Sequence, residues 1–242
     1  MESSLKEQLR ALLQEKSVCH GEFTLASGAK SDFYVDARVT TLDPRGACLI
    51  GEVGWELVKK TGSKLGKHVD AIGGLTLGAD PVALSIGIAA QRQDPSSSLQ
   101  VFTVRKAAKE HGRQKRIEGN FSPGNSVVVV DDIITTGGST IQAIDAIEEA
   151  GGQIAFVIVL VDREQGGREN IEKRGHTVVP IFTRSDLIKT DGGQSPKLGA
   201  CLSRPNLSYF RLSVAKAFGV LNSPFCKRLF KQRPSPAGRL RE

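Results

Sequence analysis

Residues 127–140 read VVVVDDIITTGGST, and the fold can be predicted from this stretch. Its four consecutive valines follow a turn-forming segment, residues 122–125 (SPGN). Such a run is typical of a short strand that is buried on both faces, as in a parallel sheet. Open parallel sheets bind ligands at the carboxyl ends of their strands. We therefore expect a core strand over residues 127–130 and a ligand site immediately after it.

Two adjacent acids and a small, hydroxylated segment follow the predicted strand. Asp131 and Asp132 point in different directions along an extended strand end, and they suit vicinal hydroxyls or a metal-linked network better than an anion. Residues 135–140 (TTGGST) supply hydroxyls, closely approachable backbone N–H groups and a helix N-terminus, which together suit a phosphate. A ribose 5-phosphate carries both vicinal hydroxyls for the acid pair and a phosphate for residues 135–140. The alternative is a structural strand with solvated acids, and the apolar surroundings of the acid pair argue against it.

The chain of 242 residues is long enough for one α/β domain with appendages. It contains no apolar run that could span a bilayer, so we expect no membrane partner. Residues 1–16 (MESSLKEQLRALLQEK) are predicted to form a charged amphipathic helix and not a signal peptide. We therefore expect a cytoplasmic protein.

The formal net charge of +7 is concentrated at the C-terminus. Residues 1–184 contain 22 Lys and Arg against 23 Asp and Glu, a net charge of −1, whereas residues 224–242 contain 6 against 1, a net charge of +5. A neutral body argues against a nucleic-acid-binding core, and we expect no specific nucleic-acid partner. The basic tail can still bind polyanions weakly.

Helix and strand patterns alternate along the first three quarters of the chain. Helices are predicted near residues 4–16, 44–60, 80–90 and 140–150, and strands near residues 69–73, 99–104, 127–130, 154–161 and 178–182. Asp80 and Pro81 are predicted as the N-cap and the first residue of the third helix. Residues 21–38 are predicted to form a hairpin that turns at residues 27–30. This alternation favours an α/β fold with a mostly parallel sheet flanked by helices.

The composition changes after residue 188, which we take as the end of the domain. Within residues 189–223, residues 189–208 are rich in Gly, Pro and Ser and are predicted to be linker-like, and the apolar residues 209–221 are a candidate helix that would dock on the body. Residues 224–242 are rich in Pro and Arg and are predicted to be a basic disordered tail.

The central stretch resembles the phosphoribosyl-pyrophosphate (PRPP) signature of type I phosphoribosyltransferases, which is an apolar run, two acids, two variable residues, Thr and then small residues. The resemblance implies the fold of that family, with a small N-terminal hood segment over about residues 1–40. It also implies that PRPP is bound by nine consecutive residues: Asp131, Asp132, Ile133, Ile134, Thr135, Thr136, Gly137, Gly138 and Ser139.

Residues 105–116 (RKAAKEHGRQKR) form a cationic segment directly after a predicted strand. On composition alone, such a segment is typical of a solvated face or a mobile loop. An enzyme that uses PRPP, however, must stabilise departing pyrophosphate and exclude water, and a mobile cationic lid does both. Lys106, Lys109 and His111 suit that task.

The spacing of this segment resembles the catalytic loop of orotate phosphoribosyltransferases, Arg-Lys-x-x-Lys-x-His-Gly. The match is Arg105, Lys106, Lys109 and His111, followed by Gly112. The resemblance implies that Lys109 is catalytic together with the acid pair, and that the other three side chains contact PRPP. It also implies a homodimer in which the 105–116 loop is shared across subunits.

The resemblance extends over about residues 4–185. Residues 23–38 look like the orotate-side segment, residues 73–81 (GGLTLGADP) occupy the position of the pyrophosphate loop, and residues 160–167 (LVDREQGG) look like the segment whose arginine meets the orotate carboxylate. This implies orotate contacts from three residues: Tyr34, Thr135 and Arg163. For Arg163 the alternative is a structural ion pair with a nearby acid: Asp162, Glu164 or Glu169.

Two departures from the family pattern lie in the orotate-side segment. Ala26 stands where many members have a lysine that contacts pyrophosphate, with Lys30 as a weak substitute. Val35 stands where many members have a second aromatic residue beside the base, so only Tyr34 can stack there.

The resemblance implies transfer of the phosphoribosyl group from PRPP to orotate, giving orotidine 5′-monophosphate and pyrophosphate. The expected cofactor is Mg²⁺ carried by PRPP, with no direct protein ligand, since no carboxylate cluster offers a full metal shell. One alternative is a purine-type phosphoribosyltransferase, which the lid spacing and Arg163 disfavour. Another is a PRPP-sensing regulatory protein on the same fold, which the neutral body and the intact lid disfavour.

Overall fold

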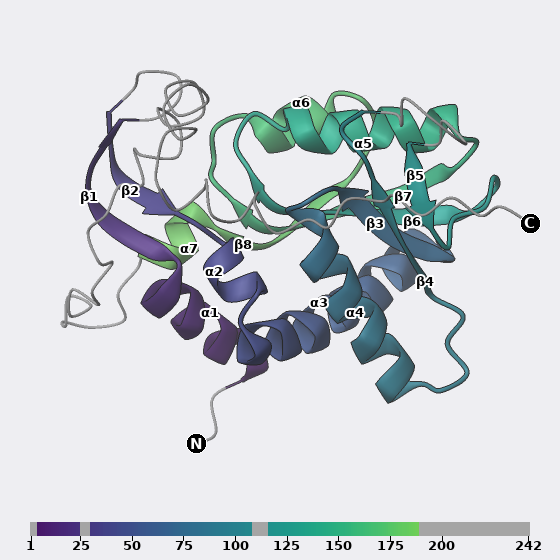
Figure 1. The fold of residues 1–242 in the computed structure, drawn as a ribbon, viewed down its shortest axis with the longest axis horizontal. Coiled ribbons are helices and arrows are strands. Elements are labelled where there is room, and N and C mark those ends of the chain that lie inside the picture. The colour runs from purple at the N-terminus through teal and green to yellow at the C-terminus, as the bar shows by residue number, and fades with distance from the viewer. Residues whose placement is uncertain (1–3, 25–29, 108–115, 189–242) are drawn as a thin grey trace, which may run out of the picture. The chain divides into compact units, whose positions relative to one another are not determined.

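A computed structural model of the chain describes residues 4–24, 30–107 and 116–188 (Figure 1). Several predictions lie outside these residues: the hairpin turn at residues 27–30, most of the 105–116 loop, and the segments 189–223 and 224–242. The domain boundaries therefore stay predictions.

A six-stranded sheet forms the centre of the described structure, in the order β5-β4-β3-β6-β7-β8. Neighbouring strands are parallel except for β4 and β5, which are antiparallel. The strands are β3 (Ala71–Leu75), β4 (Gln100–Val104), β5 (Ile117–Gly119), β6 (Ser126–Ile134), β7 (Gln153–Asp162) and β8 (Val178–Thr183). The prediction of a mostly parallel sheet is confirmed, with the valine-rich stretch in the central strand β6.

Helices cover both faces of this sheet, with α1, α3 and α4 on one face and α5 and α6 on the other (Figure 1). The helices are α1 (Leu5–Lys16), α2 (Arg38–Thr41), α3 (Pro44–Leu65), α4 (Ala79–Gln93), α5 (Gly138–Glu149), α6 (Gly167–Glu172) and α7 (Arg184–Ile188). The four longest were predicted: α1, α3 and α5 from their helical patterns, and α4 from the Asp80-Pro81 pair at its start. Short elements were not predicted (α2, α6, α7 and β5), because three to six residues are too few to show a period.

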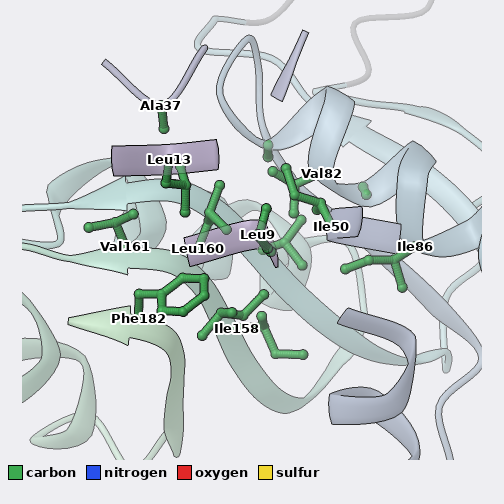
Figure 2. Close-up of a cluster of buried hydrophobic side chains, with 14 of the residues drawn as sticks. Leu9, Leu13, Ala37, Ile50, Val82, Ile86, Ile158, Leu160, Val161 and Phe182 are labelled. Carbon is green, nitrogen blue, oxygen red and sulfur yellow. The ribbon is translucent and has the colours of Figure 1, made fainter. Parts of the chain in front are cut away.

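The side chains of β6 alternate between two hydrophobic cores. Val128 and Val130 join the core under α1, α3 and α4, whereas Val127 and Val129 join the core under α5. Figure 2 shows members of the first core meeting from distant parts of the chain: Leu9, Leu13, Ile50, Val82, Ile86, Ile158, Leu160 and Phe182. Burial of this apolar area, at roughly 25 cal/mol per Å², fixes the strand register, because a slip by one residue would exchange the two faces.

Helix starts follow local side-chain chemistry. Ser4 caps α1 through a hydrogen bond from the backbone N–H of Glu7, and Asp43 caps α3 through one from Gly46. Helix α4 differs from the prediction, because its N-cap is Gly78 and Asp80 lies inside the first turn. The Asp80 carboxylate is bonded to two threonine hydroxyls instead of to the helix N–H groups.

The predicted hairpin is an antiparallel pair, β1 (Val18–Thr24) and β2 (Lys30–Val35), which forms a separate two-stranded sheet. Phe33 and Val35 are buried in the first core, so this hood segment is attached to the main body by apolar contacts. Tyr34 points to the opposite side of β2 and is 37% exposed. Tyr34 is therefore available to a ligand.

In the described parts of the chain, no helix has the length and apolar character that a membrane crossing requires.

Candidate active site

Asp131 lies on the face of β6 that meets α5. Its carboxylate accepts hydrogen bonds from the Ser139 hydroxyl (2.9 Å), the Thr140 hydroxyl (2.8 Å) and the backbone N–H of Asp132 (3.1 Å). The residue is only 4% exposed. Asp131 therefore ties the end of the central strand to the first turn of α5. A carboxylate has roughly four acceptor sites, so about one remains for a ligand.

Asp132 lies on the opposite face of β6 and is half-buried beside the loop between β3 and α4. A Cβ atom at Gly78 would clash with this carboxylate and lie 2.9 Å from its Cγ atom. Only glycine permits the loop backbone to come this close. Gly78, within residues 73–81 that were predicted as the pyrophosphate loop, thus lies against the acid pair.

Both acids bind protons more strongly than free aspartates. The pKa of Asp131 is raised to about 6, mainly by burial and also by the neighbouring Asp132, whereas the hydroxyls of Thr140 and Ser139 act to lower it. Burial also raises the pKa of Asp132, against the lowering effects of the Ile133 N–H group and the Arg38 guanidinium. Paired, desolvated acceptors of this kind suit hydroxyl donors such as a ribose diol.

The loop between β6 and α5 presents an open helix N-terminus. Gly137 has a φ of 83° and no side chain caps α5, so the first N–H groups of this helix are available to an anion. A Cβ atom at Gly137 would lie 2.9 Å from the Gly167 carbonyl, which is too close. Asn170 supports the loop by donating to the Thr136 carbonyl (3.1 Å).

The predicted PRPP-binding residues differ in their accessibility. The exposed residues are Thr136, Gly138 and Ser139, and the half-buried ones are Ile133 and Thr135. Ile134 is 1% exposed and belongs to the core under α5, so its side chain cannot reach a ligand.

Arg163 follows the last residue of β7, at the same carboxyl edge of the sheet. Its backbone N–H donates to the Ile134 carbonyl (3.0 Å), which places it next to the central loop. The side chain is 7% exposed, and its Nε is buried without a hydrogen-bond partner. Burial lowers the pKa of Arg163, against the raising effect of Tyr34, and the positive charge of Arg184 lowers it further.

The nearby acids do not compensate this buried cation. Asp162 accepts from the backbone N–H of Glu164 (2.8 Å), and Glu164 accepts from the hydroxyl of Ser185 (2.7 Å). No ion pair joins Arg163 to Asp162, Glu164, Glu169 or another described residue. The structural ion-pair alternative for Arg163 is therefore wrong within the described structure.

The hood brings Tyr34 to this edge of the sheet. Tyr34 acts electrostatically on Arg163, although the two residues are far apart in the sequence. The neighbouring Phe33 ring lies under the Arg184 guanidinium, 5.4 Å from ring centroid to guanidinium carbon. Tyr34 is thus near enough to influence the charge of Arg163, whose backbone is bonded to the end of β6.

The ends of the cationic loop are fixed to the sheet. The backbone N–H of Arg105 donates to the Arg116 carbonyl (2.8 Å), and the Arg105 guanidinium pairs with Glu118 on β5 (2.9 Å). Lys106 is exposed, and its carbonyl accepts from Gln142 on α5 (3.1 Å). Lys109 and His111 lie outside the described residues, so their predicted roles stay predictions.

Known proteins are similar to this chain in sequence and fold. Residues 81–184 match the phosphoribosyl transferase domain family. An orotate phosphoribosyltransferase of Aquifex aeolicus is 41% identical over 186 residues, which cover 76% of this chain and 97% of that protein. The chain belongs to the orotate phosphoribosyltransferase family.

Solved structures of the orotate phosphoribosyltransferase family agree with this assignment. The Mycobacterium tuberculosis enzyme in complex with Fe(III) dicitrate is 39% identical, with a TM-score of 0.66 over 77% of this chain and 100% of that chain. The same enzyme in complex with PRPP is 35% identical, with a TM-score of 0.62 over 76% and 99% of the two chains. The predicted family and the predicted type I phosphoribosyltransferase fold are confirmed.

Two residues at the site were not predicted from the sequence. Arg38 holds Asp36 through a paired contact (3.0 and 3.1 Å) and lowers the pKa of Asp132. Asp80 bonds the pyrophosphate-loop segment to β4. Both lie inside segments that resemble the family, residues 23–38 and 73–81, and that position is the only signal that could have identified them.

The acid pair fits magnesium as PRPP would carry it. In the described parts of the chain, no three His, Cys, Asp or Glu side chains gather closely enough to hold a metal ion. Mg²⁺ is commonly bound through one or two carboxylates together with substrate phosphates and water. Asp131 and Asp132 can supply that protein share, directly or through water.

Proposed function

We propose that this protein transfers the 5-phosphoribosyl group from PRPP to orotate, giving orotidine 5′-monophosphate and pyrophosphate. It would thereby serve pyrimidine nucleotide synthesis, including that of UMP. The names of its relatives support this reaction. The structural observation that carries it is Arg163, a buried arginine that pairs with no acid among the described residues, at the ligand-binding edge of the sheet.

A buried, uncompensated guanidinium is costly to the folded protein unless an anion pairs with it. Orotate carries a carboxylate, which a planar guanidinium can bind through two parallel hydrogen bonds. Uracil, adenine and hypoxanthine have no carboxylate. Arg163 is therefore the group that selects the base in this proposal, with Tyr34 stacking on the ring and Thr135 beside it.

PRPP is held by the groups around the end of β6. Asp132, which is half-buried, accepts hydrogen bonds from the ribose hydroxyls. Asp131 offers its remaining acceptor site to the ribose and also holds the loop to α5. The N-terminus of α5, with Thr136 to Ser139, binds the 5′-phosphate. These contacts fix the anomeric carbon in line with orotate N1, which attacks with inversion.

Charge stabilisation comes from the cationic loop. Lys109, with Arg105, Lys106 and His111, neutralises the pyrophosphate as it departs and excludes water from the ribosyl centre. Mg²⁺, when bound to PRPP oxygens, neutralises further charge on the pyrophosphate. Arg105 would contact PRPP from its position beside Glu118, and that ion pair would have to be shared or broken.

We also propose a homodimer in which the 105–116 loop reaches the site of the neighbouring subunit. The fixed ends of the loop support this arrangement, because the backbone N–H of Arg105 donates to the Arg116 carbonyl and so holds both ends of the loop together at the end of β4. We further propose that the protein acts in the cytoplasm. Leu9, Leu12 and Leu13 of α1 are buried in the first core, so this helix packs as part of the fold.

The loss of orotate absorbance after addition of PRPP and Mg²⁺ tests this function. Adenine, hypoxanthine and uracil serve as comparison bases under the same conditions. Consumption of orotate alone is the expected result. Consumption of a purine would indicate a purine-type enzyme, and PRPP binding without turnover of any base would indicate a regulatory protein.

A further inference from the structure

Asp80, in the first turn of α4, connects two neighbouring strands of the sheet through their carboxyl ends. One carboxylate oxygen accepts a hydrogen bond from the Thr76 hydroxyl (2.6 Å), and the other accepts one from the Thr103 hydroxyl (2.5 Å). Thr76 follows β3, and Thr103 lies in β4. Both bonds are partly buried and involve an ionisable acceptor, so they belong to the stronger class of hydrogen bonds.

The loop held by Asp80 is the one that touches the acid pair. The backbone N–H of Thr76 donates to the Val104 carbonyl (2.8 Å), which adds a second attachment to the end of β4. Two residues further along, Gly78 lies against the carboxylate of Asp132. Segment 76–78 is thus held from β4 on one side and faces Asp132 on the other.

A structural explanation of Asp80 is available, because an acid in the first turn stabilises a helix N-terminus. The geometry argues that this is not its whole role. Both carboxylate oxygens are bonded to threonine hydroxyls, and no side chain caps the N–H groups of α4. An acid used only for the helix would be directed at those N–H groups.

We propose that Asp80 is a positioning residue that holds segment 76–78 in the conformation that binds the pyrophosphate moiety of PRPP. The proposal rests on the proposed function, because it concerns the PRPP half of that site. Asp80 does not contact the substrate in this arrangement. Asp80 instead fixes segment 76–78, whose backbone would contact the substrate, and joins this segment to β4, the strand that precedes the cationic loop.

Removal of the Thr103 hydroxyl is the sharpest test, because this hydroxyl reaches segment 76–78 only through Asp80. Thr103→Val keeps the side-chain shape, and Thr103→Ser keeps the hydroxyl. Thr103→Val and Asp80→Asn should each raise the KM for PRPP about tenfold, because a small displacement of a backbone that binds the substrate weakens that binding strongly. The KM for orotate should not change. Thr103→Ser should restore the wild-type value. In the double variant the two effects should not add, since both break one connection.

Asp94→Asn is the matched control, because Asp94 lies just beyond the other end of α4 and also accepts a bond from a hydroxyl, that of Ser96 (2.6 Å). It should leave both KM values unchanged. Melting temperatures and direct titration of PRPP without orotate complete the measurement. An unchanged PRPP affinity in Thr103→Val and Asp80→Asn, with or without a lower melting temperature, would overturn the proposal. Failure of the wild-type protein to consume orotate would instead overturn the proposed function.

Discussion

Replacement of Arg163 by alanine should weaken orotate binding and leave PRPP binding nearly unchanged. The side chain is 7% exposed, its Nε has no partner, and no described acid pairs with it, so alanine would leave no buried carboxylate behind. A hydrogen bond to a charged group contributes roughly 1.5 to 3 kcal/mol, which corresponds to a loss of orotate affinity of about one to two orders of magnitude.

The same geometry predicts little change in stability. Removal of a buried cation relieves its desolvation cost and offsets the packing lost with its methylene groups. Arg174→Ala is the matched control, because Arg174 pairs with Asp145 away from the site. It should leave both substrate affinities at the wild-type level.

Isothermal titration measures the affinities for orotate and for PRPP, and a thermal unfolding curve measures the melting temperature. Equal weakening of both substrates in Arg163→Ala would refute the reasoning, because the residue would then act on the whole site. A large fall in melting temperature with orotate affinity intact would also refute it, and would assign Arg163 a structural role.

Three further predictions concern the acid pair, the loop and the tail. Because burial raises the pKa of Asp131 from 3.8 to about 6, its ionisation disfavours the folded state. The free energy of unfolding should therefore fall as pH rises from about 4 to 6, by roughly 3 kcal/mol at most. In urea titrations Asp131→Asn should lose this part of the slope, and an unchanged slope would contradict the assignment. Lys109→Ala and Asp132→Asn should each have low activity. After verified subunit exchange, the activity of their mixture should exceed the sum of the two separate activities, because one site of the heterodimer has an intact loop and an intact acid pair. Activity equal to that sum would place the loop in its own subunit's site. Deletion of residues 224–242 lowers the net charge from +7 to +2, since that segment carries +5, and steady-state rates should persist; a folded but inactive truncation would assign the tail to the site.

The core of the fold and the position of the site were predictable from local chemistry. Four valines in a row indicate a strand that is buried on both faces. The acids and glycines come directly after this strand in the sequence, so they lie at its carboxyl end, where open parallel sheets bind ligands. The different directions of Asp131 and Asp132 were also predictable, because side chains alternate along a strand. What each acid meets on its own face was not, because those partners come from separate elements.

The contacts between distant segments could not be predicted from residue patterns. Asp80 precedes a proline and was predicted as a helix cap, whereas its partners Thr76 and Thr103 are brought to it by the sheet. Arg105 was assigned to PRPP by resemblance, and its ion pair with Glu118 depends on β5, a strand of three residues. Likewise, the absence of a described partner for Arg163 is a property of the folded surroundings and not of its neighbours in the sequence.

The alternation of β6 between two cores makes the site sensitive to the number of residues in this strand. Deletion of one residue between Val127 and Asp131 would exchange the faces of the two acids, so that Asp131 would leave the side of Thr140 and Asp132 would leave the side of Gly78. Deletion of two residues would keep the faces but shorten the strand. Length changes should therefore be tolerated in the connection between β5 and β6, before the strand begins, and not within it.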